Sequence, residues 1–404
     1  MHQLLAARGQ VVRKDALWAA IWRTGEASDE SISRTIYRLR AAMHATGGPD
    51  VVETVYSSGF RVNVPIRETQ ADQSYSFSAM TSSARPNAIS GLLSAREYLA
   101  RRTPEDVEAA AHAAQEAIAM DPAFSAAWAT LAEIRVFQAT RCLRPPREAG
   151  WLAENAAQSA LDLDPESCSA LAIRGWVRVM IERDCAAGLA DLDRAVSQDP
   201  DYWVSNLLRG WGLQAAGRHD EAVAMMRRAL ELNAMGHSVN AILALFLLFS
   251  RQEQEALDVA LELAKRFPTI DNAQGIASVV AAVNGLHEEA TAFGWKAMEL
   301  APHTPAMHAP LAYALAFSGR HEEALKVLGL IEESKLPKPS AAIAAAYLAL
   351  GDRNKAVGLL KEACERGMPQ FAWTRDDPRL ASLHGDPEVE SLWSGIWTGP
   401  HFGS

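Results

Sequence analysis

A 34-residue spacing of small side chains constrains this chain more than any other feature of its sequence. One set of small residues consists of Gly210, Ala244, Ser278 and Ala312, and a second consists of Ala222, Ala256, Ala290 and Ala324, each advancing by 34 residues. Two sets with one period are hard to obtain by chance. A period of this length indicates stacked helical units, in which small residues allow neighbouring helices to approach closely.

Prolines and glycines follow the same period. The prolines are Pro122, Pro165, Pro200, Pro268, Pro302 and Pro337, with Ala234 in the slot between Pro200 and Pro268. The glycines Gly217, Gly285 and Gly319 lie five residues before a small residue of the second set; Arg251 takes that place in one unit, and Gly351 lies likewise before Ala356. Each unit is therefore expected to be a helix, a glycine turn, a second helix and a proline stop.

This unit resembles the tetratricopeptide (TPR) repeat, which has 34 residues. The resemblance covers about residues 87–367 in seven or eight units and is closest over 215–233 and 317–333. It implies a curved α-solenoid with a concave binding surface. We assign residues 87–375 to the repeats and residues 376–404, which include Trp393, to a C-terminal cap.

Large side chains of the first helices are expected on the concave face. Counted from the 34-residue register, they are Trp211, Gln214, Leu245, Leu248, Phe249, Tyr313 and Phe317. A groove of this composition would suit a peptide or helix of a protein partner, or self-association. The alternative is that these side chains are buried between neighbouring repeats.

Residues 1–66 differ from the repeats in pattern and in charge. Residues 1–67 hold nine Lys and Arg against six Asp and Glu, whereas the whole chain has a net charge of −10. This asymmetry favours a polyanionic partner for the first segment alone. Residues 67–86 are rich in serine, lack periodicity and are interpreted as a linker.

Two helices and a hairpin are expected within this first segment. The first helix covers 14–22, and the second begins after the N-cap Ser28 and runs to about His44 with Ile32, Ile36, Leu39 and Met43 on one inward face. Alternating residues over 51–56 and 60–64 flank Ser57-Ser58-Gly59, which indicates a hairpin.

The run SDESISRTIYRLRAAM (28–43) followed by VVETVYSSGFRV (51–62) resembles the effector domain of OmpR/PhoB-type response regulators. The resemblance implies a winged helix-turn-helix whose second helix enters the major groove and whose wing reaches the minor groove of duplex DNA. The residues proposed to contact DNA are Ser31, Arg34, Thr35, Arg38, Arg40, Ser57, Ser58 and Arg61. The alternative is that the arginines form a solvated helix face.

The family's effector domain opens with a small antiparallel sheet, and this chain begins within the helix that follows it. Residues 1–66 are therefore expected to lack that sheet, either because the start codon is misplaced or because the domain is degenerate.

The sequence offers no catalytic, metal or cofactor motif. His287 and His321 each begin an HExxH-like run, but the fifth residues are Thr291 and Leu325, so the second ligand is missing. The four cysteines are scattered. With no apolar run long enough to span a bilayer, we expect a cytoplasmic protein that is not an enzyme and has no membrane partner.

The fold expected from the sequence is mainly α, with a small winged-helix domain followed by a TPR solenoid. The function expected is that of a bacterial DNA-binding transcriptional regulator, similar to winged-helix/TPR regulators. An alternative is a TPR interaction scaffold whose winged helix no longer binds DNA; a fragment of a winged-helix/TPR signalling enzyme such as a cyclase is a weaker one, because no catalytic domain is found.

Overall fold

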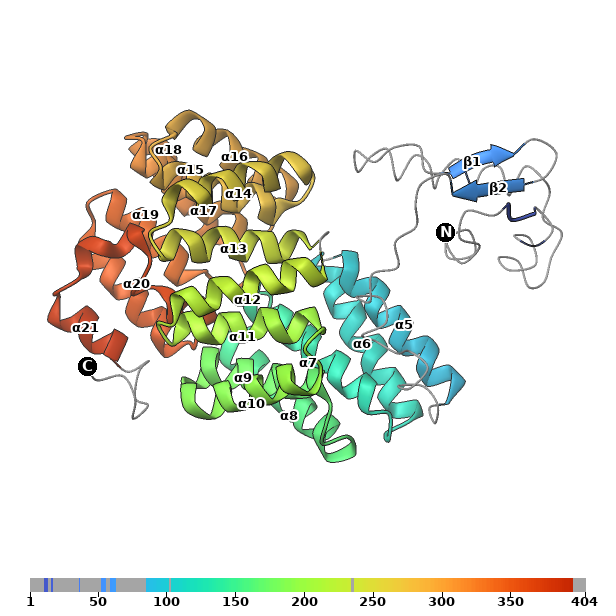
Figure 1. The fold of residues 1–404 in the computed structure, drawn as a ribbon. Coiled ribbons are helices and arrows are strands. Elements are labelled where there is room, and N and C mark those ends of the chain that lie inside the picture. Colours follow the sequence, from blue (N-terminus) through green and yellow to red (C-terminus); the bar gives the residue numbers. More distant parts are fainter. Residues whose placement is uncertain are drawn as a thin grey trace. The chain divides into compact units, whose positions relative to one another are not determined.

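The structure, a computed structural model, describes residues 11–13, 16, 36, 52–55, 59–62, 85–101, 103–233 and 236–394. The chain divides into two compact units, residues 1–72 and residues 73–404 (Figure 1). The first unit holds a β-hairpin, and the second is built from helices. Each unit is considered by itself.

The hairpin expected between residues 51 and 64 is present. Strands β1 (Val52–Val55) and β2 (Gly59–Val62) are antiparallel, with Val55 opposite Gly59. Val12 adds a further antiparallel bridge: its backbone N–H donates to the Phe60 carbonyl at 2.8 Å, and the Phe60 N–H donates to the Val12 carbonyl at 3.0 Å. Val52 and Phe60 are buried. An apolar contact and a backbone ladder therefore fix the hairpin.

The second unit consists of helices in antiparallel pairs. The pairs are α5 (Pro86–Arg101) with α6 (Pro104–Met120), α7 (Ser125–Thr140) with α8 (Pro146–Leu163), α9 (Cys168–Val177) with α10 (Cys185–Gln198), α11 (Trp203–Ala215) with α12 (His219–Leu232), α13 (His237–Phe249) with α14 (Glu253–Arg266), α15 (Asp271–Val283) with α16 (His287–Leu300), α17 (Pro305–Phe317) with α18 (His321–Glu333), and α19 (Ser340–Ala349) with α20 (Arg353–Glu365). A π-helical turn, η2 (Arg178–Glu182), extends α9.

The 34-residue period is the period of the helices. α11, α13, α15 and α17 start 34 residues apart, and so do their partners α12, α14, α16 and α18. The extra residues between Pro122 and Pro165 lengthen α7, α8 and the loop between them. The two sets of small residues meet inside the pairs: the hydroxyl of Ser278 donates to the Ala290 carbonyl at 2.7 Å. The close approach predicted from their size is confirmed.

The turn inside each pair requires a left-handed residue. Gly217, Gly285 and Gly319 have φ between 70° and 78°, and Arg251, which replaces glycine in one unit, has φ 60°. In each of these turns the N–H after the left-handed residue bonds back into the preceding helix, as that of Gln252 does to the Leu247 carbonyl at 2.9 Å. The backbone motif thus persists where the preferred residue is absent.

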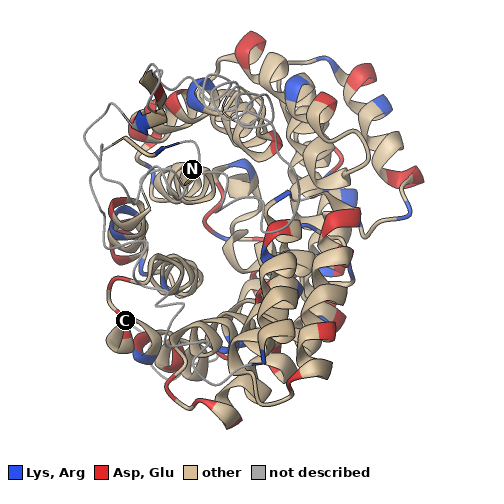
Figure 2. Ribbon diagram, turned by 90° about the vertical axis from the view of Figure 1, so that its right-hand side faces the viewer, with Lys and Arg blue, Asp and Glu red and all other residues tan. Residues whose placement is uncertain are grey.

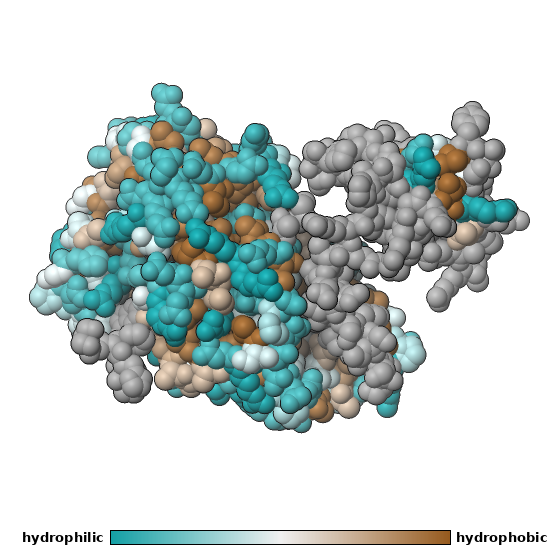
Figure 3. Space-filling model, viewed as in Figure 1, coloured by the Kyte–Doolittle hydropathy of each residue, from teal (hydrophilic) through white to brown (hydrophobic). Residues whose placement is uncertain are grey.

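First and second helices differ in burial because they occupy different layers. α13 is apolar nearly all round, with Ala241, Phe246 and Leu248 fully buried, whereas α14 buries only a stripe that includes Ala256 and Ala260. This is the expected contrast between an inner helix and a surface helix. Acidic and basic residues are interspersed along the array (Figure 2), and the face in Figure 3 is mostly hydrophilic with scattered apolar side chains.

The chain continues beyond α20 with η3 (Pro369–Trp373), η4 (Pro378–Leu383) and α21 (Pro387–Ser394). Trp393 on α21 is fully buried, and its indole N–H donates to Thr374 Oγ1 at 2.9 Å. Across the described ranges, no helix combines the length and apolarity needed to cross a membrane.

Candidate functional site

The wing of the first unit carries the one predicted DNA contact that the structure describes. Arg61 lies on β2 opposite Glu53 on β1, and its Nε lies 2.8 Å from Glu53 Oε2. Their side chains are 44% and 41% exposed. An exposed ion pair of this kind contributes about 0.2–1 kcal/mol. The guanidinium is therefore held on the hairpin surface and is easily separated from its partner.

The geometry of the wing depends on Gly59. Its φ is +148°, and a Cβ added there would lie 2.1 Å from the Val12 carbonyl oxygen. That oxygen accepts the Phe60 N–H, so a side chain at residue 59 would push Val12 off the sheet. Sequence reasoning missed the Val12 bridge; the β-branched pair Val11-Val12 is the signal that would have indicated it.

Of the proposed second helix, the structure describes Ile36, which is helical and 5% exposed. Its burial agrees with the inward position expected from the apolar spacing. The other predicted DNA contacts, namely Ser31, Arg34, Thr35, Arg38, Arg40, Ser57 and Ser58, lie outside the described residues.

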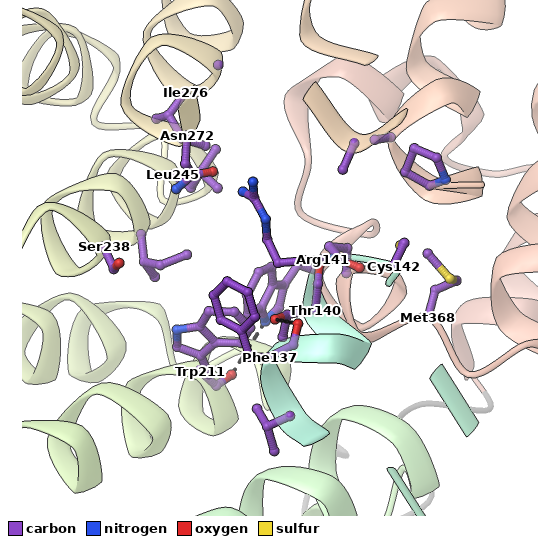
Figure 4. Close-up of a pocket in the computed structure, with 18 of the residues that line it drawn as sticks. Phe137, Thr140, Arg141, Cys142, Trp211, Ser238, Leu245, Asn272, Ile276 and Met368 are labelled. Carbon is purple, nitrogen blue, oxygen red and sulfur yellow. Dashed lines mark hydrogen bonds between the residues drawn. The ribbon is translucent and has the colours of Figure 1, made fainter. Parts of the chain in front are cut away.

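The array encloses a cavity of about 370 Å³. Its wall comes from first helices and from the chain beyond α20, and Figure 4 shows the side chains of Phe137, Arg141, Trp211, Leu245 and Ile276 around it. The wall is rich in aromatic side chains, with Phe137, Trp176, Trp203, Trp211, Phe249 and Trp373 among its residues.

The predicted groove residues separate into three groups. Trp211, Leu245 and Phe249 line the cavity together. Gln214 and Leu248 are fully buried inside the array and do not line it, because they face neighbouring helices. Tyr313 is 3% exposed with Arg379 stacked on its ring, while Phe317, at the end of α17, is 46% exposed.

Residues 364–383, here called the return segment, occupy much of the concave face. Trp373 packs edge-on against Trp211 with ring centroids 4.6 Å apart and against Phe246 at 5.3 Å. The side-chain amide of Gln370 donates to the Thr140 carbonyl at 2.9 Å, and Arg147 Nε donates to the Glu365 carbonyl at 2.7 Å. The segment therefore bridges the early and late repeats.

One ion pair also joins distant repeats directly. Arg141, after α7, pairs with Asp271 at the start of α15, and its second terminal nitrogen lies 3.9 Å from Met307 Sδ. A second pair in the wall, between Arg379 and Asp377, is nearly buried, with Nη2 2.6 Å from Oδ2. Burial raises the pKa of the Cys142 thiol and of the Tyr313 hydroxyl to about 12, so both stay neutral at neutral pH.

Three buried polar atoms of the wall have no hydrogen-bond partner: Trp176 Nε1, Trp211 Nε1 and Gln370 Oε1. Sequence reasoning missed Arg141, Trp176 and Trp373, and only the apolar run ending at Trp373 after the last repeat offered a signal. Elsewhere in the described chain, no three His, Cys, Asp or Glu side chains gather as metal ligands would.

The family model described as "Transcriptional regulatory protein, C terminal" matches residues 1–62. The transcriptional regulator HilA of Salmonella typhimurium is 36% identical over 63 residues, a match that spans 16% of this chain and 11% of that relative. Its counterpart from Salmonella paratyphi A matches equally.

Among solved structures, the Cut9–Hcn1 hetero-tetramer of the APC/C is similar in fold, with a TM-score of 0.51 and 16% identity over 81% of this chain and 58% of that one. Yeast Tom70 gives a TM-score of 0.47 with 17% identity over 93% of this chain and 80% of that one. Residues 1–62 are thus a winged-helix domain of the OmpR/PhoB-type transcriptional regulatory family, and the helical unit that follows is an α-solenoid of the TPR type.

Proposed function

We propose that this protein is a transcriptional regulator that reads duplex DNA through residues 1–66 and binds a protein or peptide partner, or a second copy of itself, through its repeats. The observation that carries the first part is the exposed Arg61 on the wing of a domain that matches the regulatory family. A function at promoter DNA would be carried out in the bacterial cytoplasm.

The burial of Ile36 supports the proposed reading face. An α-helix turns by about 100° per residue, so positions two residues before and after a buried residue lie about 160° from it. Those positions are Arg34 and Arg38, and Ser31 falls on the same side. We propose that the two guanidinium groups contact guanine edges in the major groove.

The remaining contacts are proposed to position the domain on the backbone. Thr35, Arg40, Ser57 and Ser58 would donate to phosphate oxygens, which fix register without reading sequence. Arg61 would exchange Glu53 for the adjacent minor groove, where a narrow A·T-rich segment attracts guanidinium groups. The exchange costs little because the Glu53 pair is exposed.

Selection from a randomised duplex pool with the full chain tests this proposal. The wild-type protein is expected to enrich one motif, and the double variant Arg34→Ala/Arg38→Ala is expected to lose it. Arg227→Ala/Arg228→Ala is the matched control, because it removes the same charge from exposed ion pairs on α12. If neither the wild type nor the control enriches any motif at low salt, the interaction scaffold becomes the better description.

The proposal for the repeats rests on their architecture and on Phe317, a large apolar side chain of the predicted groove that is exposed. A peptide that reached Trp211, Leu245 and Phe249 would have to displace the return segment, since Trp373 covers Trp211. Light scattering over a range of concentrations distinguishes the partners. A mass of twice 43.8 kDa supports self-association, which Phe317→Ala should weaken, and a monomer indicates a different protein partner.

A further inference from the structure

The interior cavity of the repeats has the size of a site for a small molecule. Its volume of about 370 Å³ falls in the range of about 300–1,000 Å³ that is usual for ligand pockets. The return segment and the Arg141–Asp271 pair bridge repeats that are far apart in sequence, so the space lies behind contacts that an extended peptide would have to break.

The charges of the wall already neutralise one another. Arg141 pairs with Asp271, and Arg379 forms a bidentate pair with Asp377. A charged ligand would have to break one of these pairs or enter without a counterion, both of which are unfavourable in an apolar site. The wall therefore selects for an uncharged ligand.

The unpartnered atoms indicate what such a ligand must offer. Trp176 is fully buried, its Nε1 has no acceptor, and its ring lies 5.9 Å from that of Trp211, whose Nε1 also has none. The amide oxygen of Gln370 lacks a donor. Buried donors without acceptors are costly, and a ligand that supplies the acceptor removes that cost.

We propose that this cavity binds one small, uncharged, largely apolar molecule whose hydroxyl or carbonyl oxygen accepts the indole N–H groups of Trp176 and Trp211. The aromatic wall supplies the apolar contact, and a hydroxyl would also donate to Gln370. The inference is independent of DNA binding, because every residue it uses belongs to the repeats.

The test uses the full chain and prodan, an uncharged naphthalene ketone whose emission shifts to the blue when it enters an apolar site. One saturable site per chain is expected, and the anionic probe anilinonaphthalene sulfonate is expected to bind at least tenfold more weakly. Trp176→Phe keeps the ring and removes the donor, so prodan affinity should fall about three- to tenfold. Trp151→Phe is the matched control, since Trp151 is 63% exposed on α8.

A second variant tests the cavity itself. Ile276→Trp places a larger side chain in the wall and should weaken prodan binding at least tenfold, whereas Leu325→Trp, at a residue that is 53% exposed on α18, should leave it unchanged. Circular dichroism checks that both variants fold, and Trp176→Phe decides the matter if they do not. Prodan binding that does not saturate, or that is unaffected by Trp176→Phe, overturns the proposal. A synthetic peptide of residues 366–379 that binds where prodan does not would overturn it in favour of a peptide groove.

Discussion

Replacing Trp373 by alanine should release the return segment without unfolding the helices that it covers. The indole is 3% exposed, packs edge-on against Trp211 and Phe246, and its Nε1 donates to the Trp211 carbonyl at 3.4 Å. Truncating a buried tryptophan to alanine costs about 3–5 kcal/mol, a value that includes the edge-on ring contacts. Repeats depend mainly on their neighbours, so this loss should fall on the segment and not on α11.

Hydrogen exchange measured by mass spectrometry reports this free energy locally. Amides of the segment, such as those of Phe371 and Thr374, bond within it, so their exchange requires it to open. A loss of about 3–5 kcal/mol corresponds to exchange faster by roughly 100- to 4,000-fold. Trp295→Ala, at a residue that is 41% exposed, is the control and should change nothing in this segment.

Two results would refute the reasoning. Unchanged exchange in residues 364–383 would mean that the Trp373 contacts do not hold the segment. An equal acceleration in α11 and α13 would mean that Trp373 belongs to the cooperative core of the repeats.

Three further predictions concern single residues. Gly59→Ala should destabilise the wing by about 1–3 kcal/mol and deprotect the Phe60 amide, because the new Cβ would lie 2.1 Å from the Val12 carbonyl oxygen; an unchanged amide argues against the bridge. Arg251→Gly should raise, and Gly285→Ala should lower, the free energy of unfolding by about 0.5–1 kcal/mol in denaturant titrations, since both residues have positive φ; equal signs would disprove the turn argument. Burial raises the pKa of Cys142 from 9.0 to about 12, so at pH 8 its thiolate fraction and its rate of alkylation by iodoacetamide should be about a thousandfold below those of the unfolded chain, recovering only as the pH approaches 12; equal rates would exclude the shift.

The repeats could be predicted from the sequence because their information is local. A helix pair needs small residues where its helices touch, and Ser278 and Ala290 keep that spacing in the printed sequence and meet in the structure. The turn was equally readable from Gly285, and Arg251 shows that backbone hydrogen bonds can impose the same turn on a residue that disfavours it.

The cavity could not be predicted, because it depends on the accumulated curvature of many repeats. Arg141 and Asp271 are 130 residues apart, and no periodicity relates them. The register placed Trp211 and Leu248 on one face, but the small rotation between helices leaves the first at the cavity and the second fully buried. The Val12 bridge was missed for a different reason, since a single bridging residue is too short to form a pattern.

The salt dependence of DNA binding tests the central claim most directly. Fluorescence anisotropy of the selected duplex is measured with the wild type and with Arg61→Ala from low to moderate salt. The logarithm of the affinity should fall linearly with the logarithm of the salt concentration, and Arg61→Ala should reduce that slope by about one while preserving the preferred motif. A wild-type affinity that does not vary with salt, or a slope that is unchanged by Arg61→Ala, would contradict a wing that grips DNA through this guanidinium.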